Sequence, residues 1–173
     1  MQEILDIVDE NGEPTGETVE REFAHADGIR HRTSHVWLAR KRNGRAEILL
    51  QKRAENKDSY PGCYDISSAG HIPAGDGFRK SAVRELKEEL GIDTDENELI
   101  YCGDRNVQWD DVFSGKPFHD NQFSRIFLLW RDMEENEFTF QKEELESVKW
   151  IGFNECVDGV QNMSFKNCIA MDE

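Results

Sequence analysis

The clearest hydrophobic pattern of the chain lies between residues 78 and 90. Its apolar positions recur at spacings of three and four residues, and they are Phe78, Ala82, Val83, Leu86 and Leu90. This spacing places them on one face of a helix that packs on a core. Gly91 follows directly, where glycine is favoured because it tolerates a positive φ angle. The pattern therefore predicts a helix over residues 78–90 that ends at Gly91.

Shorter runs around this helix predict strands. Residues 4–8, "ILDIV", run into a turn rich in Asn, Gly and Pro. Asn43 and Gly44 stand between two β-rich runs, which is a strong short-range signal for a hairpin. The later runs "ELIYCG", "SRIFLLW" and "SVKWIGF" have strand character, "FNECVDGVQNM" is interpreted as a short second helix, and "REFAHADGIRHR" is ambiguous, with a loop as one interpretation. Strands before and after one strong helix favour a mixed α/β sandwich.

Length and composition limit the class of protein. The chain has 173 residues, 37% of them hydrophobic, which fits one compact domain over residues 1–173. No run of about 18 apolar residues is present to span a membrane, and the acidic start "MQEILDIVDE" lacks the basic-then-apolar order of a signal peptide. Four cysteines lie far apart without a C-x-x-C pair, which predicts reduced thiols and a cytoplasmic location.

The formal net charge of −15 narrows the range of partners. So acidic a surface repels nucleic-acid backbones, which argues against DNA or RNA as a polymeric partner. It also repels a small anionic substrate unless bound cations reverse the local field.

The helix itself carries a cluster of acids. In "RELKEELGI", residues 84–92, the side chains of Glu85, Glu88 and Glu89 share one stripe beside the apolar stripe. Their mutual repulsion costs roughly a few tenths of a kcal/mol per pair. Clustered carboxylates suit Mg²⁺ or Mn²⁺, which also bind phosphate oxygens. The alternative is a solvated face, since the chain has 36 acidic residues.

The spacing around this cluster is more specific than the cluster alone. A glycine-rich loop, "GHIPAGDG", leads into the helix N-terminus, where free amides attract anions. Loop and helix follow the register G-x5-E-x7-R-E-U-x-E-E-x-G-U, where U is aliphatic, with the positions Gly70, Asp76, Arg84, Glu85, Leu86, Glu88, Glu89, Gly91 and Ile92. This segment, residues 70–92, resembles the Nudix box at eight of its nine fixed positions. Asp76 departs from the usual Glu and has one methylene less of reach.

The resemblance implies a Nudix-type α/β/α sandwich with a mixed sheet and one loop–helix–loop motif. It also implies a Mg²⁺-dependent hydrolase in which water attacks a diphosphate linkage of a small molecule. By the same resemblance, Glu85 and Glu89 are the principal metal ligands and Glu88 is a further ligand or orients water. The carbonyl of Gly70 can reach a metal, and Arg84 holds a glutamate by an ion pair within the catalytic group.

Beyond the box, over roughly residues 3–155, the chain resembles the Nudix subgroup that includes isopentenyl-diphosphate isomerase. His25, His31 and His71 lie where the isomerases place metal-binding histidines, although such residues are often purely structural. The catalytic cysteine of the isomerases is replaced by Ala69, which cannot transfer a proton. The later E-x-E pair is represented by Asp120 and Gln122, and Cys63 lies six residues too early to substitute. Hydrolysis is therefore preferred to isomerisation.

The mechanism is a hypothesis with several open points. One to three Mg²⁺ ions bridge the diphosphate, and a carboxylate accepts the proton of water, with Glu85, Glu88, Asp120, Glu143, Glu144 and Glu146 as candidates. Predicted substrate contacts are Lys52, Arg53 and His71. Four aromatic residues could cover a base or a prenyl chain, or belong to the core, and they are Trp37, Tyr60, Trp109 and Phe118.

The substrate is the least determined part of the hypothesis. A nucleoside diphosphate derivative is the first expectation and a prenyl diphosphate the second. The alternatives are the isomerase and a non-catalytic nucleotide-binding module, against which the complete glutamate set argues. Homodimers are common in this family, and the sequence leaves the oligomeric state open.

Overall fold

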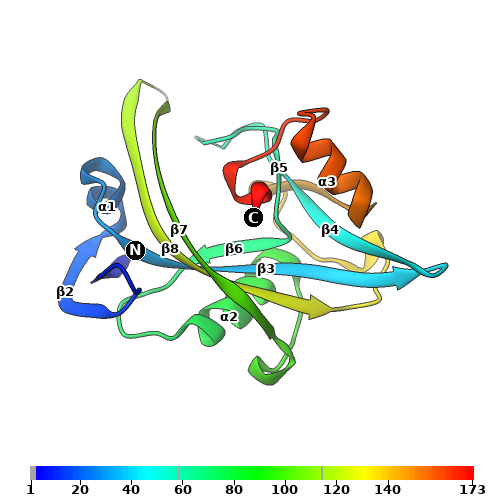
Figure 1. Cartoon of the computed structure of the whole chain (residues 1–173), viewed down its shortest axis with the longest axis horizontal. Coiled ribbons are helices and arrows are strands. Elements are labelled where there is room, and N and C mark those ends of the chain that lie inside the picture. The colour runs from blue at the N-terminus through cyan, green and yellow to red at the C-terminus, as the bar shows by residue number, and fades with distance from the viewer. Residues whose placement is uncertain (1–2, 58, 114) are drawn as a thin grey trace.

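A seven-stranded mixed sheet forms the centre of the molecule (Figure 1). The computed structural model describes residues 3–57, 59–113 and 115–173. The strands of the sheet are β3 (His31–Arg42), β4 (Arg45–Arg53), β5 (Tyr64–Asp65), β6 (Ser68–His71), β7 (Ile100–Phe113), β8 (Lys116–Trp130) and β9 (Leu145–Gly152). The order is β5-β4-β3-β8-β7, while β6 pairs with β3 and β9 pairs with β4. The β3/β8 pair is parallel and the other pairs are antiparallel.

Helices and a small second ladder surround this sheet. The helices are α1 (Arg21–Asp27), α2 (Phe78–Leu90) and α3 (Phe153–Gln161), and the 3-10 turns are η1 (Glu96–Glu98), η2 (Glu135–Glu137) and η3 (Ile169–Asp172). Strands β1 (Ile4–Val8) and β2 (Pro14–Glu20) pair with each other. No helix in the described ranges is long and apolar enough to cross a membrane.

The alternation of side chains along β3 explains the layers. Val36 and Leu38 pack with Leu86 of α2 in one buried cluster. Trp37 and Ala39 point to the opposite face and pack with the cluster that contains Cys156 of α3. Because successive residues of a strand face opposite sides, α2 and α3 cover the two faces of the sheet. The predicted α/β/α sandwich is confirmed.

Two local predictions are confirmed at the level of backbone angles. Helix α2 covers the predicted residues, and Gly91 ends it in the left-handed conformation with φ of 70°. Asn43 and Gly44 have φ angles of 50° and 77° and connect Arg42 to Arg45 in the hairpin between β3 and β4. Two positive φ angles match the twist of the flanking strands.

The structure differs from the sequence prediction in two places. Residues 21–27 form helix α1 rather than a loop, because Ala24 and His25 bury one face of this single short helix before Gly28 ends it. Strands β7 and β8 also extend well past their apolar runs, up to the pair Phe113 and Lys116. In this hairpin arm, aromatic side chains contact each other across the two strands within a largely polar sequence.

Helix α2 is expected to depend on its buried face. Leu86→Ala should lower the free energy of unfolding by about 2–5 kcal/mol, because Leu86 is fully buried and its loss leaves a cavity. Lys87→Ala, at the exposed neighbouring position, should change it by about 0.5 kcal/mol or less. Equilibrium unfolding in urea measures both values, and equal losses would contradict the packing of Leu86 between helix and sheet.

Candidate active site

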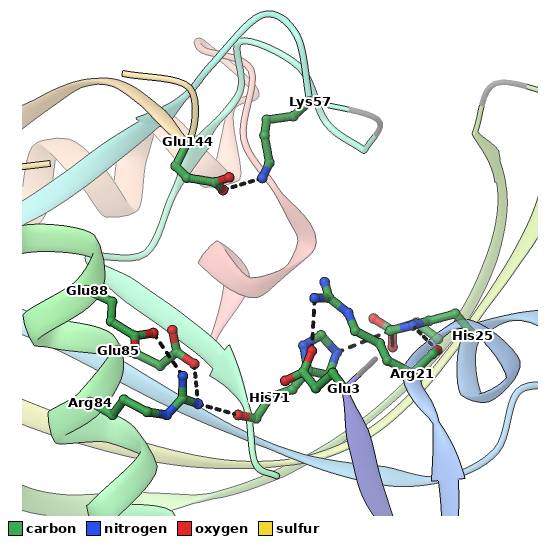
Figure 2. Close-up of polar contacts among 10 residues, drawn as sticks. Glu3, Arg21, His25, Lys57, His71, Arg84, Glu85, Glu88 and Glu144 are labelled. Atoms are coloured by element: carbon green, nitrogen blue, oxygen red, sulfur yellow. Dashed lines mark hydrogen bonds and ion pairs between the residues drawn. The ribbon is translucent and has the colours of Figure 1, made fainter. Parts of the chain in front are cut away.

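The short strand β6 connects the two groups of polar residues that the sequence singled out. Its first residues, Ser68 and Ala69, donate hydrogen bonds to Glu89 of α2. Its last residue, His71, lies beside His25 (Figure 2). Arg84 joins the two groups, since its Nη2 atom lies 3.3 Å from the carbonyl oxygen of His71. Residues that are distant in sequence are thereby gathered around four positions of one strand.

Arg84 organises the acids on the exposed side of α2. Its Nη2 donates to Oε1 of Glu85 over 2.7 Å, and its Nη1 donates to Oε2 of Glu88 over 2.9 Å. The expected ion pair of Arg84 is therefore present, and it is shared by two carboxylates (Figure 2). Glu85 is largely buried, with 14% of its side chain exposed, whereas Glu88 is exposed.

Glu89 lies on the inner side of the same stripe. Its Oε2 atom accepts hydrogen bonds from the hydroxyl of Ser68 (2.7 Å) and the backbone N–H of Ala69 (3.3 Å). Loss of solvent, reinforced by the nearby charge of Glu85, raises the pKa of Glu89 to about 8. Desolvation likewise raises the pKa of Glu85 to about 7, although Arg84 opposes this rise. For both carboxylates, the loss of solvent therefore outweighs the ion pair and hydrogen bonds that favour the charged form.

The contact between Gly70 and Glu85 explains why glycine stands at this position. A Cβ atom on residue 70 would lie 2.2 Å from Cδ of Glu85, which is far inside van der Waals contact. Without a side chain, the backbone of β6 can approach the carboxylate closely. Clustered carboxylate oxygens are the hard donors that a divalent cation such as Mg²⁺ prefers, so the residues present fit this metal.

The three histidines form a compact cluster. One nitrogen from each of His25, His31 and His71 lies within 4.8 Å of the others. The Nδ1 atoms of His25 and His31 face the backbone carbonyls of Arg21 (3.0 Å) and Ile29 (2.9 Å). As donors to these carbonyls, the two rings keep Nε2 unprotonated and directed toward the cluster.

Asp120 of β8 faces this cluster. Its Oδ1 atom lies 3.7 Å from Nε2 of His25 and 4.0 Å from Nε2 of His31. The Oδ1 atom and Nε2 of His31 are both buried without a hydrogen-bond partner in the described ranges. Desolvation raises the pKa of Asp120 to about 6 and lowers the pKa of His25 to about 4. It also lowers the pKa values of His31 and His71.

Other predicted site residues are engaged elsewhere. Lys52 pairs with Glu146 over 2.8 Å. Arg53 donates to the carbonyl oxygen of Ser59 over 3.0 Å and lies 3.5 Å from Asp65. Their predicted contact with substrate remains a prediction.

Acidic candidates outside the cluster are also paired. Asp76 precedes α2, and its carboxylate pairs with Lys80 in the first turn of that helix. Glu144 pairs with Lys57 (Figure 2). His71, predicted as a substrate contact, points its Nε2 atom at that of His25, 3.4 Å away.

Some contacts at the site were not expected from the sequence. Ser68 binds Glu89, and Gln122 donates its amide N–H to Oδ2 of Asp120 over 2.8 Å. The side chain of Phe118 stacks on His25 with ring centroids 4.6 Å apart and contacts Trp109 and Phe113 of the arm. Most of these contacts depend on the pairing of β3 with β8. No local sequence pattern predicts this pairing.

Comparison with known proteins establishes the class. Residues 29–166 match the family model described as NUDIX domain. The chain therefore belongs to the Nudix family.

Individual relatives agree with this class. Nudix hydrolase 3 of Arabidopsis thaliana is 40% identical over 158 residues, which cover 89% of this chain and 20% of that protein. An uncharacterized Nudix hydrolase of Clostridium acetobutylicum is 35% identical over 161 residues, 93% of this chain and 75% of that protein. This chain thus spans one fifth of the first relative's length and three quarters of the second's. The crystal structure of DR0079 from Deinococcus radiodurans has a TM-score of 0.71 at 16% identity, covering 98% of this chain and 96% of that one.

The raised pKa values of the α2 carboxylates predict a pH dependence of stability without metal. Glu89 has a pKa near 4.5 when unfolded and about 8 when folded. The folded state therefore binds more protons between these values, and stability falls as the pH rises through them. Glu89→Gln should accordingly raise the free energy of unfolding at pH 8 by about 1 kcal/mol or more.

Urea denaturation in the presence of a chelator measures this effect. The gain should shrink toward pH 5, where the Glu89 carboxyl of the folded state is protonated. Asp93→Asn serves as the control, because Asp93 is exposed and pairs with Lys87. A stability loss for Glu89→Gln at pH 8 would show that its carboxylate supports the fold by itself.

Proposed function

We propose that the chain hydrolyses a diphosphate linkage in a small molecule with the help of Mg²⁺, for which Mn²⁺ can substitute. One observation carries the proposal: Glu85 and Glu89 have raised pKa values, and both lie against the backbone of β6. Neighbouring carboxylates in such surroundings are stabilised by a bound cation. The protein has a net charge of −15, and a cation at this place also offsets its repulsion of an anionic substrate.

The residues of α2 and β6 have distinct roles in this proposal. Glu85, Glu88, Glu89 and the carbonyl of Gly70 would hold Mg²⁺, which when bound polarises the diphosphate and lowers the pKa of an attacking water. Arg84 keeps Glu85 and Glu88 in place through its two hydrogen bonds. The proposed number of ions is one to three.

Asp120 is the favoured general base. Its pKa of about 6 lies near neutral pH, where a base is both ionised and able to accept a proton. Glu85 and Glu88 remain alternatives. Glu144 and Glu146 are less suitable because each is paired with a lysine.

A nucleoside diphosphate derivative is proposed as the substrate, with a prenyl diphosphate second. The aromatic side chains Tyr60, Trp109, Phe113 and Phe118 contact one another beside His25 and can cover either group. Isomerisation is disfavoured because Ala69 stands where a proton-transferring cysteine would be needed. Four free cysteines support a reducing, cytoplasmic setting.

The His25, His31 and His71 cluster is proposed as a second cation site. Two of its rings are fixed by backbone carbonyls and direct unprotonated nitrogens inward, as ligating histidines do. Imidazole donors favour a transition-metal ion over Mg²⁺.

Glu89→Gln should reduce hydrolysis by about 10²-fold or more, because the change removes a metal ligand while preserving shape. The assay supplies Mg²⁺ with a panel of nucleoside and prenyl diphosphates and identifies each product by mass. Asp93→Asn should retain wild-type turnover. Binding of the diphosphates without hydrolysis of any of them would favour a non-catalytic module. A product of unchanged mass from isopentenyl diphosphate would establish isomerisation.

His25→Gln should abolish tight Zn²⁺ binding at the histidine cluster, because it removes one of three ligands. Isothermal titration of the protein with Zn²⁺ measures the affinity. His119→Gln is the matched control, since His119 is more exposed and faces Asp110 instead of the cluster. Equal affinities for wild type and His25→Gln would leave the three histidines a purely structural role.

A further inference from the structure

The side chain of Glu173 is buried against β3, far along the chain from the other site residues. Its Oε1 atom accepts from the indole N–H of Trp37 over 3.0 Å, and its Oε2 atom lies 2.9 Å from Nδ1 of His35. The Glu173 side chain is 2% exposed and that of His35 is 5% exposed. The guanidinium of Arg105 lies 3.8 Å away. A carboxylate in this position accepts from each neighbour and can donate to none.

Further hydrogen bonds lead from His35 toward the histidine cluster. The Nε2 atom of His35 lies 3.3 Å from the hydroxyl oxygen of Thr33, which lies 3.2 Å from Oε1 of Gln122. The amide nitrogen of Gln122 donates to Oδ2 of Asp120 over 2.8 Å. The other oxygen of Asp120 faces His25 and His31. Five side chains from β3, β8 and the C-terminal residue thus form one chain of contacts.

Counting donors fixes the direction of this chain. Asp120 can only accept as a carboxylate, so the amide nitrogen of Gln122 must face it and the Gln122 oxygen must face Thr33. The hydroxyl oxygen of Thr33 also lies 2.8 Å from that of Ser124. If every one of these contacts is a hydrogen bond, Ser124 donates to Thr33 and the single hydroxyl hydrogen of Thr33 is used for Gln122. Nε2 of His35 must donate to Thr33, while Nδ1 must donate to Glu173. In this arrangement both ring nitrogens of His35 act as donors, Nδ1 toward the Glu173 carboxylate and Nε2 toward Thr33.

We propose that Glu173 is a positioning residue of the active site, which acts through His35, Thr33 and Gln122 to orient Asp120 against the three histidines. When the charge of Glu173 is removed, His35 becomes neutral and its Nε2 turns into an acceptor. The Thr33 hydrogen then points to His35, and Gln122 loses the donor that fixes its amide. The catalytic consequence rests on the proposed function, whereas the protonation of His35 does not.

The chain offers a matched control for a purely mechanical role of this terminal turn. Asp172, the preceding residue, is largely exposed, and its carboxylate pairs with Arg105 over 2.7 Å. A role limited to fastening the turn predicts similar effects of Asp172→Asn and Glu173→Gln. The positioning role predicts effects of Glu173→Gln alone.

Nitrogen NMR of the histidine rings tests the hydrogen-bond chain directly. At neutral pH, wild type and Asp172→Asn should show His35 with both nitrogens protonated, and Glu173→Gln should show neutral His35 with shifted ring signals of His25 and His31. A neutral His35 in wild type overturns the proposal. So does a Glu173→Gln spectrum that differs from wild type no more than that of Asp172→Asn. Circular dichroism of each variant confirms that it is folded.

Turnover of a diphosphate substrate tests the consequence for catalysis. Glu173→Gln should lower kcat about 10-fold or more with little change in KM, as loss of an orienting partner does, while Asp172→Asn stays within about twofold of wild type. In a Thr33→Val background the Glu173→Gln change should add little, because the chain is already interrupted. Unchanged kcat in Glu173→Gln, or full additivity with Thr33→Val, overturns the positioning role. A charged His35 in a protein inactive on every diphosphate would instead count against the proposed function.

Discussion

The close contact between the acids of α2 and the backbone of β6 is the constraint on which the site depends. Glu89 is tied to Ser68 and Ala69, and Glu85 lies in the space that Gly70 leaves by lacking a side chain. Bringing carboxylates so close to a strand removes water from them and raises their pKa values. The fold accepts this electrostatic penalty at one face of α2 while Leu86 and Leu90 anchor the other.

The same strand connects this acidic ridge to a very different environment. One residue beyond Gly70, His71 enters a cluster of neutral histidines whose pKa values are lowered by burial. Acids that resist ionisation and imidazoles that resist protonation therefore lie on either side of β6. Positive charge is scarce around both the glutamates and the histidines. Only the glutamates have a cationic partner among the contacts described above, which is Arg84. Under the proposed function, each group meets this deficit by binding a cation.

The sequence predicts the parts of the structure that follow from local periodicity. Helix α2, its end at Gly91 and the Asn43-Gly44 turn depend on neighbouring residues, and they occur as predicted. Helix α1 was ambiguous because its seven residues bury only one short face. The contacts of Gln122 and Glu173 could not be predicted, since they depend on the parallel pairing of β3 with β8 and on where the terminal turn docks. The roles of the acids in catalysis remain predictions.

The parallel pairing of β3 and β8 also has a consequence for how the molecule is made. His31 pairs with Gln122 and Ala39 with Trp130, so about ninety residues separate the partners in sequence. Contacts at such separation slow folding, because the intervening chain must be ordered before they form. During synthesis, the edge of β3 that receives β8 waits unpaired until the ribosome has released residue 130. A nascent chain with such an edge is open to wrong pairing, which makes the interval between these two strands the vulnerable period of its biogenesis.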